Sequence, residues 1–463
     1  MTAADIDDVA VTAGELVEAL AARKVGALEL ADAAIARIER LDGPINAVVV
    51  RDFDRARDAA KAADAALARG ERRPLLGLPM TVKEAHNIAG LPTTWGSPMF
   101  QGWEPEIDAL GVSRLKAAGA VILGKTNVPP FLSDWQSNNP IYGRTNNPWD
   151  TSRTAGGSSG GGAAALAAGF TALEFGSDIG GSIRVPAAFC GVFGHKPSHG
   201  IIPSRGHAPP GIDGGDIPLA VIGPMARSAA DLGLALDVLA GPPPEEAVAY
   251  RLVLPPSRGR SFSDFRVLML TQHPAAPVDH EILAALDELA SRLEASGAKV
   301  SRHSPLVPDL AAAHSVYMSI LGPLMSPPEA LMADDAPRVG AWLQAHHAQT
   351  LIRRAWAALF ETVDVVIAPS LGVVAFPHDD SPDMQARTLS VNGEPSPYFS
   401  QLAWPGMATL ANLPATAAPI GRTKGGLPIG AQFIGPYLED RTTIAFAGLV
   451  EQAFDGFTPP PGY

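Results

Sequence analysis

Three serines and one lysine stand in sequence blocks that suit nucleophilic catalysis. Ser158 and Ser159 lie in "GGSSGG", Ser182 lies in "GSDIGGSIR", and Lys83 ends the apolar stretch "GLPMTVK". A serine hydroxyl attacks poorly until a base takes its proton, and a lysine serves as that base when burial lowers its pKa. We therefore expect one of these serines to attack, another to relay its proton, and Lys83 to accept it.

The glycines around the serines indicate a backbone that bends sharply or approaches other atoms closely. A turn at Gly180 and Gly181 would let successive backbone N–H groups converge beside Ser182, as an oxyanion hole requires. Two other interpretations are weaker. A nucleophile elbow at Ser158 needs a strand directly before it, and "NNPWDTSRTA" is polar and contains a proline. A phosphate-binding loop needs a lysine where Gly162 stands.

Taken together, the blocks resemble the amidase signature family. The resemblance rests on "GGSSGG", "GSDIGGSIRVPAAFCG", "GHKP", "GLPMTVKE", "GKTN" and "GLPIGAQFIG", which extend over nearly the whole chain. It implies that Ser182 is the nucleophile, that Ser158, after a cis peptide bond, is the relay, and that Lys83 is the base. It also implies an oxyanion hole formed by four backbone N–H groups, those of Ile179, Gly180, Gly181 and Ser182.

The resemblance further implies an amidase that hydrolyses the C–N bond of linear carboxylic amides (EC 3.5.1 type) through an acyl-enzyme. Esters and carbamates pass through a similar tetrahedral oxyanion, so their cleavage stays open. The alternative within the same family is the catalytic subunit of a tRNA-dependent glutamyl or aspartyl amidotransferase, which would need partner subunits. A non-catalytic relative is disfavoured because all three catalytic positions are filled.

Several other residues have expected roles near this site. Asp178 and Arg184 are predicted to form a structural pair, and Trp135, Gly157 and Ser159 are candidate substrate-binding residues. The segment 305–400 is expected to shape a pocket for a small hydrophobic or aryl substrate. Its large apolar and aromatic residues are Tyr317, Met318, Leu321, Leu324, Met325, Trp342, Trp356 and Phe360. His195 and Cys190 are expected to be buried structural residues.

Alternating helix and strand patterns surround these residues and predict an α/β fold. Strands are expected at 46–50, 75–84, 120–127, 171–178, 266–270 and 363–370, and helices at 29–41, 53–68, 163–169, 279–300 and 440–454. We predict a large mixed, twisted central sheet covered on both faces by helices, in a single domain over residues 1–463. Within it, a core motif region would cover about 75–235 and a variable pocket region about 242–400.

Composition limits the possible partners. Hydrophobic residues make up 46% of the 463-residue chain, charged residues 18%, and the net charge is −13, which argues against a nucleic-acid or anionic-membrane surface. The single cysteine cannot form an intrachain disulfide, and neither a signal peptide nor a membrane span is predicted. We expect a cytoplasmic protein that acts on a small-molecule amide without nucleic acid, membrane, metal or cofactor. A homodimer is compatible with the sequence.

Overall fold

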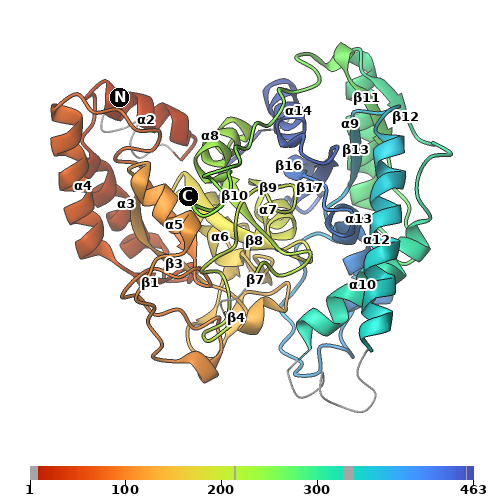
Figure 1. The fold of residues 1–463 in the computed structure, drawn as a ribbon, viewed down its shortest axis with the longest axis horizontal. Helices are drawn as coiled ribbons and strands as arrows, with labels where there is room; N and C mark the ends of the chain where they lie inside the picture. Colours follow the sequence, from red (N-terminus) through yellow and green to blue (C-terminus); the bar gives the residue numbers. More distant parts are fainter. Residues whose placement is uncertain (1–8, 213–214, 327–337, 455) are drawn as a thin grey trace.

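An eleven-stranded mixed sheet forms the centre of the protein (Figure 1). The computed structural model describes residues 9–212, 215–326, 338–454 and 456–463. In hydrogen-bonded order the strands are β1 (Val48–Arg51), β3 (Val121–Thr126), β2 (Pro79–Lys83), β8 (Leu173–Asp178), β10 (Val221–Ala226), β9 (Phe193–Lys196), β16 (Ala415–Arg422), β17 (Pro428–Ile434), β13 (Val365–Pro369), β11 (Arg266–Met269) and β12 (Lys299–Ser301). The predicted mixed α/β sheet is confirmed, and strands from the segment 242–400 extend the same sheet.

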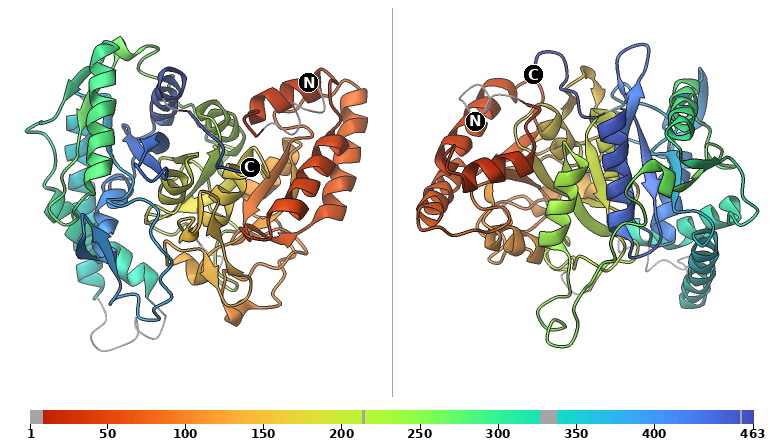
Figure 2. Two further views of the ribbon diagram at one scale, coloured as in Figure 1. Left: turned by 180° about the vertical axis from the view of Figure 1, so that it is seen from behind. Right: turned by 90° about the horizontal axis from the view of Figure 1, so that it is seen from above.

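Helices lie along the whole length of this sheet (Figure 2). In chain order they are α2 (Ala13–Ala21), α3 (Ala27–Leu41), α4 (Phe53–Ala68), α5 (Leu110–Ala117), α6 (Gly160–Ala167), α7 (Arg184–Cys190), α8 (Ala229–Leu239), α9 (His280–Ala295), α10 (Leu310–Met325), α12 (Val339–Leu359), α13 (Ala403–Leu410) and α14 (Asp440–Ala453). Helices α2 to α4 lie at one end of the molecule, and α9, α10 and α12 lie at the other (Figure 1).

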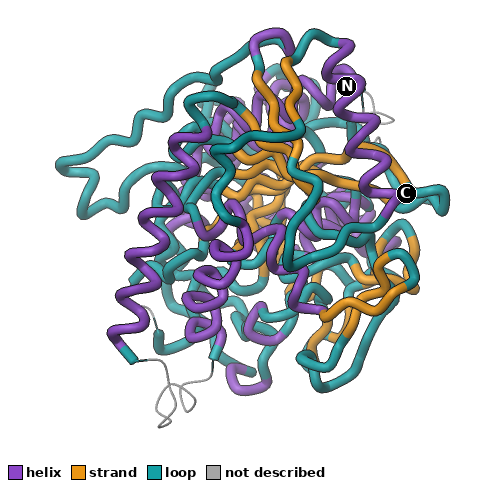
Figure 3. The backbone as a smooth tube through the Cα atoms, turned by 90° about the vertical axis from the view of Figure 1, so that its right-hand side faces the viewer, coloured by secondary structure: helices purple, strands orange, loops and turns teal. Residues whose placement is uncertain are grey.

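Two hydrophobic clusters pack on opposite faces of the sheet. One combines α5, α8, α9 and α14 with strand residues such as Ile122, and the other combines α3, α4, α6 and α7 with strand residues such as Leu123. These two residues are neighbours in β3, and successive strand side chains point to opposite faces. Helices therefore cover both faces and leave the strands in the interior, as Figure 3 shows.

Small two-stranded sheets lie beside the large one. They pair β4 (Asn138–Asn139) with β5 (Gly143–Arg144), β6 (Asn146–Asn147) with β7 (Asp150–Thr154), and β14 (Thr388–Val391) with β15 (Glu394–Pro397). The sequence predicts no strand directly before the glycine-rich segment around Ser158, but β7 lies there. It pairs with β6, through a register shift at Asn146 and Asn147, and Arg153 forms an isolated bridge with Pro377, so β7 is not a strand of the central sheet.

Two helix starts differ from the prediction for identifiable reasons. Helix α3 begins two residues early because the Asp64 carboxylate accepts hydrogen bonds from the backbone N–H groups of Ala27 and Leu28. Helix α6 begins at Gly160, so part of the glycine run is helical. The helix lies so close to β3 that a Cβ atom on Gly161 would lie 2.2 Å from the backbone nitrogen of Asn127. Among the described residues, no helix combines the length and hydropathy needed to cross a membrane.

Candidate active site

The site lies where two neighbouring parallel strands end. Lys83 is the last residue of β2, and Ser177 and Asp178 are the last residues of β8, which pairs with β2 in parallel. The carboxyl ends of parallel strands lie at the same edge of a sheet, so this pairing brings the lysine beside the serine. The chain after β8 forms a short loop through Ser182 into α7, and the segment containing Ser158 leads into α6.

Three serine hydroxyls surround the buried amine of Lys83. Its Nζ donates hydrogen bonds to Ser158 Oγ at 2.7 Å, Ser159 Oγ at 2.9 Å and Ser177 Oγ at 2.9 Å. The Lys83 side chain is completely buried. Among the described residues, no carboxylate lies within ion-pair distance of Nζ. The amine therefore has hydrogen-bond partners but no direct counter-ion.

This environment favours the neutral amine. Burial lowers the pKa of Lys83 from 10.5 to about 7, and the more distant negative charges of Asp178 and Glu174 oppose that shift only in part. At pH 7 an ordinary lysine is neutral in only about four molecules in ten thousand, whereas a group with a pKa near 7 is neutral in about half. Lys83 thus has the protonation equilibrium that a general base needs near neutral pH.

The two predicted catalytic serines differ in their contacts. The peptide bond between Gly157 and Ser158 is cis, and Ser158 is buried with its hydroxyl on Lys83. Ser182 is 6% exposed and lines a cavity. Its carbonyl accepts a hydrogen bond from the Ser159 N–H at 3.1 Å. The hydrogen bonds of the described residues include none between the hydroxyls of Ser158 and Ser182, and the backbone bond at Ser159 links the two serine segments.

Glycines allow the two serine segments to approach their neighbours. A Cβ atom on Gly157 would lie 2.3 Å from the carbonyl oxygen of Asp134, so any larger residue would push these segments apart. Gly181 has φ +93°, in the left-handed region that favours glycine, and its turn directs the chain toward Ser182.

The loop from Ile179 to Ser182 presents backbone N–H groups, but not all four that the sequence predicts. The Gly181 N–H donates to Asp178 Oδ1 at 2.9 Å, so this group is already occupied. The N–H groups of Ile179, Gly180 and Ser182 have no acceptor among the described residues. The geometry therefore leaves three candidate oxyanion donors and makes Gly181 a turn residue whose N–H fixes the loop.

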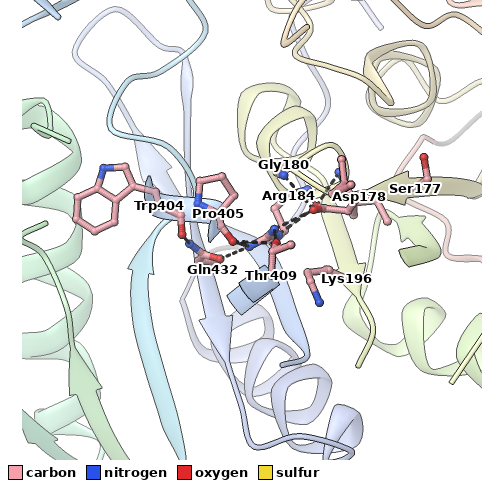
Figure 4. A network of polar contacts seen from close by, with 12 residues as sticks. Ser177, Asp178, Gly180, Arg184, Lys196, Trp404, Pro405, Thr409 and Gln432 are labelled. Atoms are coloured by element: carbon pink, nitrogen blue, oxygen red, sulfur yellow. Dashed lines mark hydrogen bonds and ion pairs between the residues drawn. The ribbon is translucent and has the colours of Figure 1, made fainter. Parts of the chain in front are cut away.

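An ion pair beneath this loop holds it in place, as the sequence predicts. Arg184 Nη2 lies 2.8 Å from Asp178 Oδ1, and both side chains are fully buried. Arg184 also donates to the Pro405 carbonyl, Gln432 Oε1 and Thr409 Oγ1 (Figure 4). Burial alone would raise the pKa of Asp178, but Arg184 lowers it to about 2, so the carboxylate stays ionised. A charged, fully bonded pair suits a structural role.

A cavity of about 410 Å³ opens beside Ser182. Its wall includes Trp135, Ile179, Gly180 and an apolar group formed by Met318, Leu321, Met325, Met384, Phe399 and Leu402. Trp135, Met318, Leu321 and Met325 thus lie where the sequence places them. Gly157 and Ser159 are not among the described lining residues, because Gly157 packs on Asp134 and Ser159 contacts Lys83.

Other members of the 305–400 set do not line the cavity. Leu324 and Trp342 pack against the cluster that contains Trp135, whereas Trp356 and Phe360 belong to the main core. Tyr317 is fully buried beneath the wall, and its hydroxyl donates to the Ile179 carbonyl at 2.7 Å. Tyr317, Leu324 and Trp342 therefore pack with the residues around the cavity without lining it.

The one acidic side chain among the described lining residues is already paired. Asp134 accepts hydrogen bonds from Arg387 Nη1 at 2.7 Å and from the Tyr398 hydroxyl at 2.5 Å. Arg387 itself is only 9% exposed. Neither this pair nor Ser177 was predicted from the sequence, although Ser177 directly precedes Asp178 in the "GSDIGGSIR" block. The described lining therefore offers a substrate mainly apolar side chains and no unpaired charge, together with the polar side chains of Ser133, Ser182, Ser326 and Gln385.

Two further predictions concern buried residues outside the site. His195 lies in β9, where Nε2 is 3.1 Å from Asp440 Oδ1 and Nδ1 is 2.9 Å from Thr416 Oγ1. Cys190 is buried in the cluster formed with α3, α4 and α6, and burial raises the pKa of its thiol. Both are packed structural residues, as expected.

Comparison with known proteins identifies the family. The Amidase family model matches residues 29–326 and 328–444. The chain belongs to the amidase signature family. The match includes Lys83, Ser158 and Ser182, so all three positions lie within the family region.

Individual amidase signature relatives match almost the full length. The A subunit of glutamyl-tRNA(Gln) amidotransferase from Roseiflexus castenholzii is 32% identical, covering 97% of both chains. Fatty-acid amide hydrolase 2-A of Danio rerio is 31% identical, covering 97% of this chain and 90% of the relative. An inhibitor-bound vestigial protein complex, solved in work on the origins of an s-triazine catabolic enzyme, matches with TM-score 0.83 and 31% identity, covering 97% of this chain and all of that chain.

Proposed function

We propose that the protein cleaves the C–N bond of carboxylic amides through an acyl-enzyme on Ser182. The observation that carries this proposal is the buried Lys83 amine, whose pKa burial lowers to about 7 and whose Nζ lies 2.7 Å from Ser158 Oγ. Membership of the amidase signature family supports the same class of reaction.

In the proposed first step, neutral Lys83 accepts a proton from the Ser158 hydroxyl while Ser158 accepts the proton of Ser182. Ser182 Oγ then bonds to the carbonyl carbon, and the carbonyl π electrons move to oxygen. In this proposal the backbone N–H groups of Ile179, Gly180 and Ser182, which have no acceptor among the described residues, stabilise that oxyanion. Such stabilisation is the largest contribution in many reactions of this kind. The tetrahedral adduct collapses when the C–N bond breaks, and the proton returns through Ser158 to the leaving nitrogen. A water molecule then attacks the carbonyl carbon of the acyl-enzyme, and its proton passes through Ser158 to Lys83. Collapse of this second adduct breaks the bond to Ser182 Oγ, returns the proton to that oxygen and releases the carboxylic acid.

The identity of the amide divides the proposal into two candidates. The curated relatives support the amidotransferase alternative better than the free-standing amidase, since several relatives at 32–33% identity are A subunits of glutamyl-tRNA(Gln) amidotransferases. In that case glutamine would be the amide, and partner subunits would use the ammonia. Fatty-acid amide hydrolase 2-A matches at nearly the same identity, so the preference for the amidotransferase rests on how many relatives are A subunits and not on the level of identity.

One structural observation favours the free-standing amidase. Free glutamine carries an α-ammonium and an α-carboxylate, and a site that binds it needs groups that pair with those charges. The only acidic lining residue among those described, Asp134, is already paired with Arg387, and the rest of the wall is largely apolar. These contacts support an uncharged, apolar acyl group such as an aryl or aliphatic chain.

A substrate panel on the purified chain separates the two candidates. The panel comprises glutamine, aryl amides, aliphatic amides, esters and carbamates, with ammonia or amine release as the readout for the amides and acid release for the others. Turnover of apolar amides without any partner supports the amidase. Glutamine hydrolysis that exceeds turnover of every apolar amide supports the amidotransferase alternative. Absence of turnover together with absence of covalent labelling at Ser182 would contradict both.

A further inference from the structure

Two aromatic side chains hold the loop that carries the candidate oxyanion donors. The Tyr317 hydroxyl donates to the Ile179 carbonyl at 2.7 Å, and Trp135 Nε1 donates to the Gly180 carbonyl at 3.0 Å. We propose that Tyr317 and Trp135 are positioning residues of the oxyanion hole: Tyr317 aims the Gly180 N–H by binding the carbonyl of the same peptide plane, and Trp135 fixes the next peptide plane, between the Gly180 and Ser182 N–H groups. This inference rests on the proposed function, because it concerns the same site.

The geometry of a peptide unit gives these bonds their effect. In a trans peptide the C=O and the following N–H lie in one plane and point in opposite directions. A hydroxyl that fixes the Ile179 carbonyl therefore also fixes the direction of the Gly180 N–H. That N–H has no acceptor among the described residues, so it is available to a substrate oxyanion. Tyr317 acts on this donor from the opposite side of its peptide plane.

The next peptide is held at both ends. Trp135 binds the Gly180 carbonyl, and Asp178 Oδ1 accepts the Gly181 N–H at 2.9 Å. This peptide therefore contributes no free donor, but it fixes the chain between the Gly180 and Ser182 N–H groups. Two donors on either side of a clamped peptide keep a constant relative position, which preorganised stabilisation of an oxyanion requires.

Both aromatic residues are themselves well anchored. Tyr317 is completely buried, and its ring packs so closely on α13 that a Cβ atom on Gly406 would lie 2.7 Å from it. The backbone N–H of Trp135 donates to the Tyr398 hydroxyl at 3.3 Å, and that hydroxyl in turn donates to the Asp134 carboxylate. The two aromatic residues therefore transmit the rigidity of the surrounding core to the loop.

Trp135 also lines the cavity beside Ser182. An acyl group that packs on the indole thus touches the same side chain that holds the Gly180 carbonyl. Binding of a well-fitting acyl group would restrict the indole and with it the loop, so Trp135 links recognition of the acyl group to the reaction step. This link is additional to the packing role that a cavity-lining tryptophan has by itself.

The test uses phenylmethylsulfonyl fluoride, whose sulfonyl oxygens gain negative charge as the serine attacks. In the wild-type protein, the maximal inactivation rate and the half-saturating concentration are measured separately. Tyr317→Phe and Trp135→Phe keep an aromatic ring and remove the donor, whereas Tyr142→Phe removes a hydroxyl that bonds Glu84 instead. We expect the first two to lower the maximal rate about 10- to 100-fold, below the loss from deleting an oxyanion donor itself. In Tyr317→Phe the half-saturating concentration should change less than about 3-fold, and in Tyr142→Phe both the maximal rate and the half-saturating concentration should.

Each result decides the proposal. Unchanged maximal rates in folded Tyr317→Phe and Trp135→Phe would overturn it. An effect confined to the half-saturating concentration would also overturn it, because that pattern reports pocket packing alone. If Tyr317→Phe does not fold, Trp135→Phe gives the decision. A wild-type protein that is not labelled at Ser182 would overturn the proposed function as well, and this result is obtained before any variant is compared.

Discussion

Lys83 Nζ lies 2.7 Å from Ser158 Oγ at the end of a buried parallel strand pair, with no carboxylate among the described residues at ion-pair distance. Because of this arrangement, a large fraction of Lys83 is neutral near pH 7 and can accept a proton. The Ser158 hydroxyl is close enough to donate that proton. Both properties have consequences that pH-dependent rates and stabilities can measure.

The first prediction is a rise of kcat/KM with pH through an apparent pKa near 7. Neutral Lys83 accumulates as pH rises through its lowered pKa, so the rate increases and then levels off. Lys83→Ala should lose nearly all activity, and Lys83→Arg should not restore it, because arginine stays protonated. The measurement is a pH–rate profile on the best amide of the substrate panel.

Two control variants test whether this rise of kcat/KM with pH comes from Lys83. Burial also lowers the pKa of Lys196 to about 7, but its Nζ donates to the carbonyls of Pro197 and Leu413, away from the serines. Burial raises the pKa of Glu174 to about 7. Folded Lys196→Met and Glu174→Gln proteins should still show the rise of kcat/KM with pH. If the rise disappeared in either variant, in which Lys83 is intact, the titrating group would not be Lys83.

The second prediction concerns stability. The folded-state pKa of Lys83 is lower than the unfolded one, so the folded state is penalised below pH 7, and the penalty fades as pH rises toward 10.5. Each pKa unit corresponds to about 1.4 kcal/mol. Relative to wild type, the unfolding free energy of Lys83→Met should increase as pH falls from about 10 to about 7. Urea unfolding at several pH values measures this. Lys116→Met, on an exposed lysine, should give a curve parallel to that of the wild type.

The extent of sequence-based prediction differs between parts of the molecule. The mixed α/β fold follows from hydrophobic periodicity, which is a local signal, whereas the roles expected for the two serine segments and Lys83 follow from the resemblance of their motifs to the amidase signature family. The loop clamp does not, since Tyr317 lies 138 residues from Ile179 and any buried tyrosine would have the same local pattern. The hydrogen bond from the Gly181 N–H to Asp178 was not predictable either. It depends on the conformation of the turn, and a Gly-Gly dipeptide is compatible with many turn conformations.

The third prediction concerns the paired acid in the cavity wall. Arg387→Gln leaves the Asp134 carboxylate without its counter-charge, so KM for uncharged apolar amides should rise while the relative kcat/KM for cationic amides improves. The double variant Asp134→Asn with Arg387→Gln should recover the preference for uncharged amides. A single variant with the wild-type ranking of substrates would show that Asp134 does not contribute to selectivity.

The fourth prediction concerns the ion pair beneath the loop. Asp178→Asn leaves Arg184 charged, fully buried and without its carboxylate, which should cost about 3–5 kcal/mol in unfolding free energy. Disrupting the partly exposed pair of Arg441 and Asp237 by Asp237→Asn should cost less than about 1 kcal/mol. Denaturant unfolding compares the two. Equal losses would show that burial of the first pair has no energetic consequence.

The most direct test of the proposed mechanism maps the site of covalent labelling. The wild-type protein and the Ser182→Ala, Ser158→Ala and Lys83→Ala variants are treated with phenylmethylsulfonyl fluoride at about pH 8, above the lowered pKa of Lys83, and analysed by peptide mass spectrometry. We predict a label on Ser182 in wild type, none in Ser182→Ala, and labelling of Ser182 slowed by at least about 100-fold in the other two variants. A label on Ser158 or Ser159 in the wild type, or undiminished labelling of Ser182 in Lys83→Ala, would contradict the mechanism.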